Sequence, residues 1–530
     1  MPTLEWIGKS KVINHHQDVP FRVLERKYSF DENGQTDADN GSENMIIRGD
    51  NLEALKALLP RYEGRVKCIY IDPPYNTGNE GWVYNDNVND PKIKKWLGEV
   101  VGKEGEDLTR HDKWLCMMYP RLKMLQKLLA DDGVIFISID EIEHRYLELV
   151  MDEIFGSANR IDTFVWQNNY GGGAKSNYVV HLHEYVLCFA KNISTVGKIE
   201  LPPDDNILKY YKYKDEKFDT RGPYRLQPLA TTSMDDRPNL RYPLFYEGHE
   251  VWPAKQWFWS KERALEAQAN DELVFSEKNG KWTVNYKQYL NGADGTQRKS
   301  KPYSIITGIY TQAGTKAIKE IMGSGKAFDF PKPPELIMYF IQMITGKDDI
   351  VLDSFAGSGT TAHAVLNMNK ADGGHRKFIL IEMMDYADSI TAERVKRVIK
   401  GYGEGKNAVE GTGGNFSFYD LGEPLLHGDV LNENVGVEKI REYVYFTDTK
   451  ASLPESHPDE PYFMGVHIGS AYYFYYEKQS VTTLNREFLH TVKTEADAYV
   501  IYADLCTLSE AELEKYHITF KKIPRDITRL

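Results

Sequence analysis

Short apolar runs alternate with amphipathic segments in two separate parts of the chain. In the first part, residues 45–48 and the run VKCIYI (66–71) have the composition of buried strands, and residues 51–59 place leucines at helical spacing between them. The run VIFISI (134–139) and residues 185–190 predict further strands. In the second part, a helix is expected over 334–345 and a strand over 350–352. Strands alternating with helices predict an α/β fold with a doubly wound, mostly parallel sheet.

Changes in composition divide the chain into segments. The polar stretch at 31–44 predicts disorder, and the glycine-rich stretch at 401–415 predicts a boundary. We therefore expect an N-terminal extension (1–44), two halves of one catalytic domain (45–192 and 328–402), an insert between them (193–327), a linker (403–424) and a small C-terminal α+β domain (425–530).

The tetrapeptide DPPY (Asp72–Tyr75) directly follows the apolar run at 66–71. It therefore lies at the carboxyl end of a strand, where open α/β sheets bind ligands. The Asp72 side chain and a proline carbonyl can hold both N–H groups of a planar amine, while Tyr75 stacks on its ring. This arrangement suits chemistry on the exocyclic nitrogen of a nucleobase. A proline-stiffened turn without chemistry is the alternative.

A second motif, FAGSGTT, opens a predicted helix at Thr360, directly after a strand that ends near Asp353. Gly357 and Gly359 allow a ligand to approach the backbone at the helix start. The next strand ends at Glu382, at about the distance expected for an acidic partner of ribose hydroxyls. Ala362 replaces the third glycine of the dinucleotide motif, which weakens a pyrophosphate interpretation and leaves open an adenosine cofactor without phosphates, such as S-adenosylmethionine.

Together, DPPYNTG and FAGSGTT resemble the motifs of the DNA amino-methyltransferases. The catalytic motif precedes the cofactor motif, as in the beta class of that family, and the segments at 111–129, 131–141, 183–191 and 330–337 resemble its linking motifs. The resemblance implies an S-adenosylmethionine-dependent fold with Asp72, Pro73, Pro74 and Tyr75 as catalytic residues. It also implies cofactor-binding residues, which are Asp50, Asn51, Lys332, Asp353, Phe355, Ala356, Gly357, Ser358, Gly359, Thr360 and Glu382.

More particularly, MPTLEWIGK and REYVYFTDT resemble modification subunits of type III restriction systems. The implied reaction is methyl transfer to adenine N6 in duplex DNA, with the base rotated out of the helix. The alternatives are cytosine-N4 methylation, whose enzymes usually carry serine where this chain has Asp72, methylation of RNA or protein glutamine, a recognition subunit without activity, and a solitary methyltransferase. A homodimer and a helicase–nuclease subunit are the expected protein partners.

Charge is unevenly distributed along the chain. The net charge is −13, yet residues 161–310 carry 20 Lys and Arg against 18 Asp and Glu and are rich in aromatic residues. Local cations mixed with aromatic rings suit contact with nucleic acid, so the insert is the expected target-recognition domain. The four cysteines lack metal-binding spacing, and we expect no metal site, no signal peptide and no membrane span, which fits a cytoplasmic protein.

Overall fold

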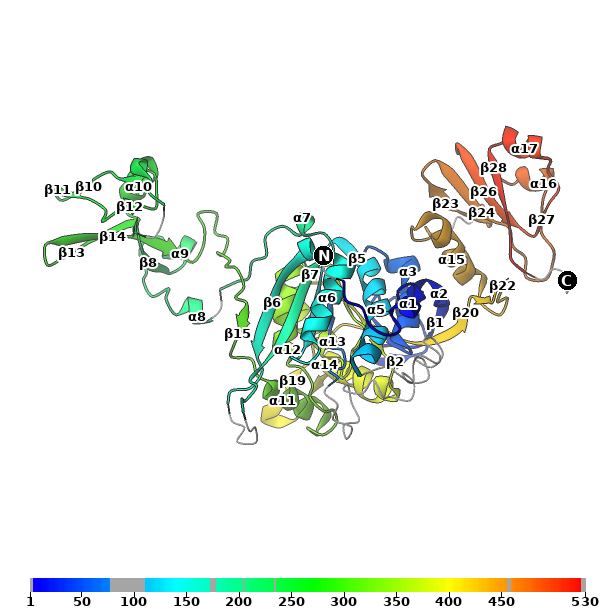
Figure 1. The fold of residues 1–530 in the computed structure, drawn as a ribbon, viewed down its shortest axis with the longest axis horizontal. Coiled ribbons are helices and arrows are strands. Elements are labelled where there is room, and N and C mark those ends of the chain that lie inside the picture. The colour runs from blue at the N-terminus through cyan, green and yellow to red at the C-terminus, as the bar shows by residue number, and fades with distance from the viewer. Residues whose placement is uncertain are drawn as a thin grey trace. The chain divides into compact units, whose positions relative to one another are not determined.

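The computed structural model describes residues 3–76, 110–171, 178–203, 205–232, 235–454 and 459–525 (Figure 1). The chain divides into two compact units. The main unit comprises Met1–Lys198 and Tyr303–Leu530, and the inserted unit comprises Ile199–Pro302. The segment from Asn76 to Thr109, expected as a lid or DNA-facing loop, lies outside the described residues from position 77 onward.

An 11-stranded sheet forms the centre of the main unit. Its six middle strands, from β5 to β20, are all parallel, whereas β7, β1 and β2 contribute the antiparallel pairings near its ends. This confirms the predicted mostly parallel sheet. The strand order is β15 (Ile305–Ile306), β6 (Arg160–Gln167), β7 (His183–Ala190), β5 (Leu129–Ile139), β4 (Val66–Ile71), β16 (Ile350–Asp353), β17 (Lys377–Glu382), β3 (Met45–Arg48), β20 (Phe416–Pro424), β1 (Arg22–Asp31) and β2 (Gly34–Thr36).

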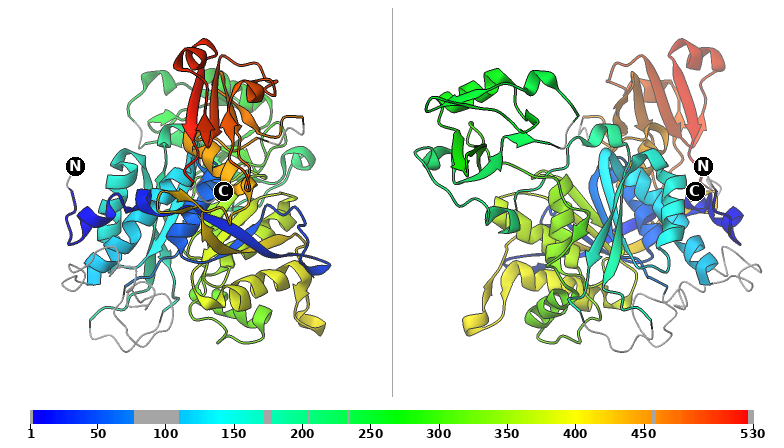
Figure 2. Two further views of the ribbon diagram at one scale, coloured as in Figure 1. Left: turned by 90° about the vertical axis from the view of Figure 1, so that its right-hand side faces the viewer. Right: turned by 60° about the vertical axis from the view of Figure 1, so that its left-hand side comes forward.

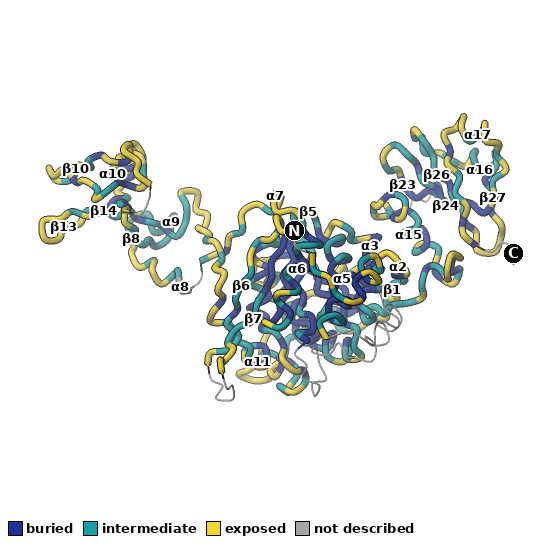
Figure 3. The backbone as a smooth tube through the Cα atoms, viewed as in Figure 1, coloured by how far each residue is buried: buried dark blue, intermediate teal, exposed yellow. Residues whose placement is uncertain are grey.

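Helices cover both faces of this sheet (Figure 2). Successive side chains of a strand point to opposite faces. In β4, Ile69 and Ile71 belong to the core cluster that includes α3 (Asn51–Tyr62), α5 (Arg110–Leu128) and α6 (His144–Phe155). Between them, Tyr70 stacks on Phe340 of α12 (Pro334–Ile344), with ring centroids 6.2 Å apart. Helix α12 packs against α13 (Thr360–Asp372), which contacts α14 (Glu393–Lys400). The central strands are accordingly buried (Figure 3).

The two halves of the catalytic domain meet in the middle of the sheet. Strand β4 from the first half pairs in parallel with β16 from the second half, with Cys68 opposite Val351 and Ile69 opposite Leu352. Strand β17 then pairs with β16 and with β3. Since parallel strands end at the same edge of a sheet, the DPPY loop, the FAGSG loop and Glu382 are brought to one edge.

Two segments expected to be irregular are strands of this sheet. Strand β1 includes Asp31 and is followed by β2, so the prediction of disorder throughout 31–44 was wrong. The expected linker at 403–424 contains β20, which pairs with β3 and β1. Aromatic side chains hold this pairing, because Tyr28 of β1 stacks on Phe418 of β20 at 5.1 Å.

The inserted unit is smaller than the predicted insert of 193–327. It contains a three-stranded antiparallel sheet of β13 (Leu273–Lys278), β14 (Lys281–Tyr289) and β8 (Tyr224–Pro228), with its own core around Trp257. Residues 303–327 belong to the main unit, where β15 joins the large sheet and α11 (Thr311–Met322) packs against α14.

The C-terminal segment contains both helices and strands. Its four-stranded mixed sheet has the order β23 (Phe463–His467), β24 (Ser470–Phe474), β26 (Ala498–Ala503) and β28 (Ile518–Lys522), and α15 (Val437–Thr449) precedes it. No helix of the described chain combines the length and apolarity needed to cross a bilayer. Among the described residues there is no group of three His, Cys, Asp or Glu side chains arranged to hold a metal ion.

Candidate active site

Side chains of α5 and of Glu143, the residue that precedes α6, hold the DPPY loop in place. Trp114 of α5 donates its indole N–H to the Pro74 carbonyl at 2.6 Å. Asn76, at φ 60°, donates its amide to the buried Glu143 carboxylate at 2.5 Å, and His111 contacts the same carboxylate at 2.6 Å. Among the described residues, no donor reaches the Pro73 carbonyl. Of the two proline carbonyls, only that of Pro74 accepts a hydrogen bond from a described residue.

The Lys332 ammonium group lies at the centre of a cluster around Asp72. It is 2.9 Å from Asp72 Oδ1, 2.7 Å from the Tyr75 hydroxyl and 3.4 Å from Glu184 Oε2, and its side chain is only 10% exposed. The Tyr75 hydroxyl in turn donates to Glu184 at 2.9 Å. Burial raises the pKa of Asp72, and the neighbouring Lys332 charge works against that rise.

The placement of Lys332 differs from the sequence-based expectation. From the sequence, Lys332 either approaches the methionine carboxylate of the cofactor or is a solvated lysine, and the structure shows a buried side chain. Its ammonium group is bound to the DPPY side chains, so its position supports a role at the reacting centre rather than at a cofactor carboxylate. Glu184 was missed as a site residue, although a carboxylate near the start of the apolar strand β7 is a signal that could have found it.

Removing the Lys332 charge is expected to destabilise the fold. Without Lys332, the Asp72 and Glu184 carboxylates would be buried without a counter-charge, so Lys332→Met should cost roughly 3 kcal/mol of unfolding free energy at pH 8. The pKa of Asp72, already raised by burial, would then rise further, and a raised carboxyl pKa destabilises the fold only where the group must ionise. Urea unfolding should therefore show a smaller deficit at pH 5 than at pH 8.

The exposed Lys326 supplies the matched control for this experiment. Lys326→Met should change the unfolding free energy by less than about 0.5 kcal/mol. Adding Asp72→Asn to Lys332→Met should restore part of the lost stability. Equal stability of Lys332→Met and wild type at pH 8 would contradict the importance of this charge cluster.

The FAGSG loop connects β16 to α13 through two glycines in the left-handed region, Gly357 at φ 53° and Gly359 at φ 79°. A Cβ on Gly359 would lie 3.0 Å from the Thr391 carbonyl oxygen, so close packing also favours glycine there. Asp353 fixes both ends of the turn, because its carboxylate accepts the Phe355 N–H at 3.0 Å and the Thr361 hydroxyl at 2.5 Å. Burial raises the pKa of Asp353 to about 7.

Glu382 connects the end of β17 to the same loop. Its carboxylate accepts the Gly357 N–H at 2.8 Å and the Met384 N–H at 2.9 Å. Burial raises the pKa of Glu382 to about 7, while these backbone hydrogen bonds oppose the rise. A buried carboxylate beside a glycine turn is the arrangement expected for binding ribose hydroxyls.

Asp50 and Asn51 lie at the end of the neighbouring strand β3. The Asp50 carboxylate caps α3 by accepting the Leu52 N–H at 2.9 Å and the Glu53 N–H at 3.1 Å, which is the structural role expected at that position. The Asn51 amide donates to the Ser354 carbonyl at 3.2 Å. The Gly49 N–H also donates to the Glu382 carbonyl at 3.0 Å, so this turn adjoins the other two.

Both motifs line a single pocket. Asp72 and Lys332 form part of its wall, and the FAGSG turn forms another part. The wall residues from the turn are Asp353, Phe355, Ala356, Gly357, Ser358 and Thr360. Glu382 adjoins this wall through its bond to the Gly357 N–H. The pocket is narrow, about 20 Å³ in volume, and it places Asp72 directly beside the glycine turn.

Arg394 of α14 binds side chains of the residues that form this wall. It was not identified from the sequence. Its buried guanidinium donates to the Ser358 hydroxyl at 2.7 Å, the Thr360 hydroxyl at 2.6 Å and His363 Nδ1 at 3.2 Å. Burial lowers the pKa of Arg394 to about 9. No sequence signal distinguishes it from the other cations of that helix.

Comparison with known proteins identifies the family. The family N6_N4_Mtase, described as DNA methylase, matches residues 66–393. The chain belongs to this DNA methylase family. The match begins with β4, includes the DPPY loop, the FAGSG turn and Glu382, and ends in α14. The predicted resemblance to DNA methyltransferases is thereby confirmed.

Individual relatives agree with this assignment. The chain is 33% identical to the Mod subunit of the type III restriction-modification enzyme StyLTI from Salmonella typhimurium, over 68% of this chain and 57% of that protein. It is 34% identical to the EcoPI Mod subunit of Escherichia phage P1, over 72% and 63%. It is also 34% identical to the type II methyltransferase M.KpnI of Klebsiella pneumoniae, over 67% and 84%. The chain thus spans less than two thirds of the two Mod subunits.

Proposed function

We propose that this DNA methylase uses S-adenosylmethionine to methylate adenine N6 in duplex DNA, as the modification component of a type III-like restriction system. The observation that carries the proposal is the single pocket lined by Asp72 and by the glycine turn beside Glu382. Family membership supports the reaction class, and the two Mod subunits among the relatives support the type III system.

The target amine is held by acceptors of the DPPY loop. Adenine N6 is a weak nucleophile because its lone pair is delocalised into the ring. The Asp72 carboxylate and the available Pro73 carbonyl accept its two N–H groups and favour a pyramidal nitrogen. S-adenosylmethionine supplies a methyl group activated by a sulfonium. Asp72 then stabilises the positive charge that develops on the nitrogen and accepts its proton, and Tyr75 stacks on the extruded base.

Lys332 has a specific part in this scheme. Its ammonium group donates to Asp72 Oδ1, so a substrate N–H either binds the other carboxylate oxygen or displaces the lysine. Glu184 offers the lysine a second carboxylate 3.4 Å away, so the ammonium group can leave Asp72 and remain paired. The Lys332 charge therefore opposes the rise in the pKa of Asp72 that burial causes.

The cofactor contacts follow from the same pocket. Glu382 is suited to accept ribose hydroxyls, and the glycine turn from Phe355 to Gly359 allows close backbone approach. Asp353 and Thr360 hold this turn in shape. Asp50 and Asn51, at the adjoining turn, are assigned to the adenine end of the cofactor on the family resemblance.

Identification of the modified base tests this function. The purified chain is incubated with duplex DNA and S-adenosylmethionine carrying a tritiated methyl group, and the digested nucleosides are separated and identified by mass spectrometry. Label in N6-methyladenine is expected. Label in N4-methylcytosine would overturn the base assignment, and the absence of label in any nucleoside would overturn the reaction.

Partners are proposed on the same basis. Duplex DNA is the substrate, and a homodimer and a helicase–nuclease subunit are the protein partners implied by the type III relatives. Sequencing modified bases in the host genome, with and without this gene, would give the recognition sequence and show whether one or both strands are modified.

A further inference from the structure

Positive charge is concentrated at one end of the inserted unit. Residues 209–225 and 287–301 together carry ten Lys and Arg against four Asp and Glu, whereas the remaining residues of the unit, 199–208, 226–286 and 302, carry seven against twelve. The net charge of the whole inserted unit is close to zero, so it does not reveal this separation. We call residues 209–225 and 287–301 the basic surface.

The two segments of the basic surface lie next to each other. The Tyr213 N–H donates to the Tyr224 carbonyl at 3.1 Å, and β8 pairs with β14 so that Tyr224 lies opposite Tyr289. Arg298 then donates through Nε to the Tyr289 carbonyl at 2.8 Å. Neighbouring strands are about 4.8 Å apart, so these backbones lie within roughly 15 Å of one another.

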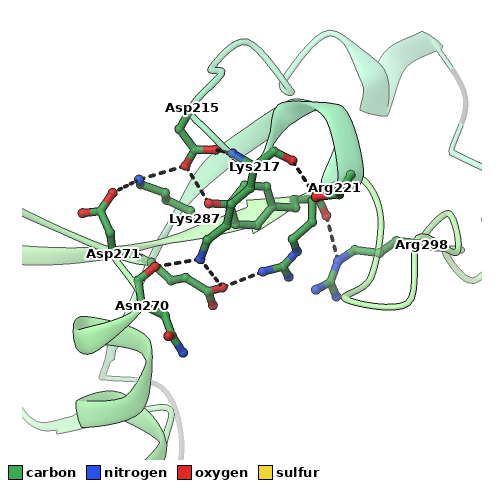
Figure 4. Close-up of polar contacts among 10 residues, drawn as sticks. Asp215, Lys217, Arg221, Asn270, Asp271, Lys287 and Arg298 are labelled. Carbon is green, nitrogen blue, oxygen red and sulfur yellow. Dashed lines mark hydrogen bonds and ion pairs between the residues drawn. The ribbon is translucent and has the colours of Figure 1, made fainter.

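An internal ionic network occupies two carboxylates near this surface (Figure 4). Asp215 accepts from Lys287 Nζ at 2.9 Å and from the Tyr289 hydroxyl at 2.6 Å. Glu272 is bound by Lys217 at 3.1 Å and by Arg221 at 2.5 Å. These inner cations therefore hold the segments together and are not available to a ligand.

The outer cations have no such carboxylate partners. Five exposed ones form no ion pair with any carboxylate of the described chain; they are Lys212, Lys214, Arg298, Lys299 and Lys301. Three exposed acids lie in the same segments, Glu216, Asp219 and Asp294, and Asp294 accepts hydrogen bonds from the Thr296 N–H and hydroxyl. Exposed aromatic side chains lie among the cations, with Tyr210 55% and Tyr213 47% exposed.

We propose that the basic surface binds the phosphate backbone of duplex DNA and fixes the inserted unit on its substrate. This inference rests on the proposed function. Duplex DNA carries one negative charge per about 1.7 Å of its axis, so five exposed cations on these adjoining segments, none paired with a carboxylate of the described chain, match several phosphates. Exposed tyrosines beside the lysines add apolar and stacking contacts to a nucleic acid. An acidic protein surface would use such contacts less well, so DNA is the better match.

Salt dependence of DNA binding tests this surface. The triple variant Lys212→Gln, Lys299→Gln, Lys301→Gln removes three exposed charges whose side chains make no ion pair or hydrogen bond with any described residue. Each lost phosphate contact should lower the slope of log affinity against log salt concentration by about 0.9, hence by about 2.7 in total, and weaken binding at least about tenfold at 50 mM salt. Fluorescence anisotropy with a labelled duplex gives both quantities.

A control triple variant removes the same charge from the rest of the unit. Lys261, Lys278 and Lys281 are exposed, and the last two face each other at the turn between β13 and β14, at the far end of β14 from Tyr289. Their replacement by glutamine should leave the slope as in wild type. The basic-surface proposal is overturned if the first triple variant keeps the wild-type slope, or if the control loses as much. Wild type that neither binds nor methylates duplex DNA would overturn the proposed function as well.

Discussion

Replacing Asp72 by alanine is expected to reduce methyl transfer to DNA at least about 10³-fold while leaving affinity for S-adenosylmethionine within about threefold. In the proposed mechanism the carboxylate accepts a target N–H and stabilises the charge that appears on the nitrogen during transfer, so its loss should raise the barrier of the chemical step. Single-turnover transfer of a labelled methyl group measures the first quantity, and calorimetric titration of the cofactor measures the second.

Two companion variants separate charge from shape at this site. Asp72→Asn keeps a carbonyl acceptor and loses the negative charge, so its rate should lie between wild type and Asp72→Ala. Tyr75→Phe keeps the stacking ring and loses the hydroxyl that links Lys332 to Glu184, and it should retain most of the rate. Near-normal turnover of Asp72→Ala would refute the mechanism.

The centre of the fold was readable from the sequence because its strands are buried on both faces. The run at 66–71 and the strand before Asp353 are almost continuously apolar, and each is followed by a motif whose residue types suit a strand-end loop. The order of these strands in the sheet, with β4 beside β16, was not predicted from the sequence. The structure shows that pairing directly.

The strands near one end of the sheet could not be predicted from the sequence, because they lack the continuous apolar runs of strands buried on both faces. Strand β1 alternates charged residues with few apolar ones, and only Tyr28, Ser29 and Phe30 are fully buried. Its partner β20 lies almost 400 residues away in the sequence. A pattern confined to one segment cannot reveal that a distant strand covers its aromatic side chains.

The same limit applies to the site. Asp72 and Tyr75 were identifiable because the whole motif is contiguous, whereas Lys332 and Glu184 join it from positions 260 and 112 residues beyond Asp72. Lys332 alone looks like an ordinary charged residue, and the sequence signal for Glu184 is only its position near the start of an apolar strand. Their function as a group depends on a shared burial that only the folded chain creates, and this is why Lys332 was assigned to the cofactor from the resemblance and is found against Asp72.

Replacing Glu382 by glutamine is expected to weaken S-adenosylmethionine binding about 100-fold. Two charge-assisted hydrogen bonds from ribose hydroxyls contribute about 1.5–3 kcal/mol each, and glutamine keeps only a neutral acceptor while placing an amide donor against the Met384 or Gly357 N–H. The exposed Glu410, with its side chain 89% exposed, provides the control, and Glu410→Gln should bind the cofactor as wild type does.

The pH dependence of cofactor binding distinguishes a ribose-binding carboxylate from a merely structural one. Burial raises the pKa of Glu382 to about 7, and the hydroxyls prefer its ionised form, so wild-type affinity should rise about tenfold from pH 6 to pH 8. Asp353, with a pKa also raised to about 7, and Asp72 remain in Glu382→Gln, so the difference between the two profiles belongs to Glu382. A variant that binds weakly but keeps the full wild-type pH profile would show that Glu382 acts only by shaping the glycine turn.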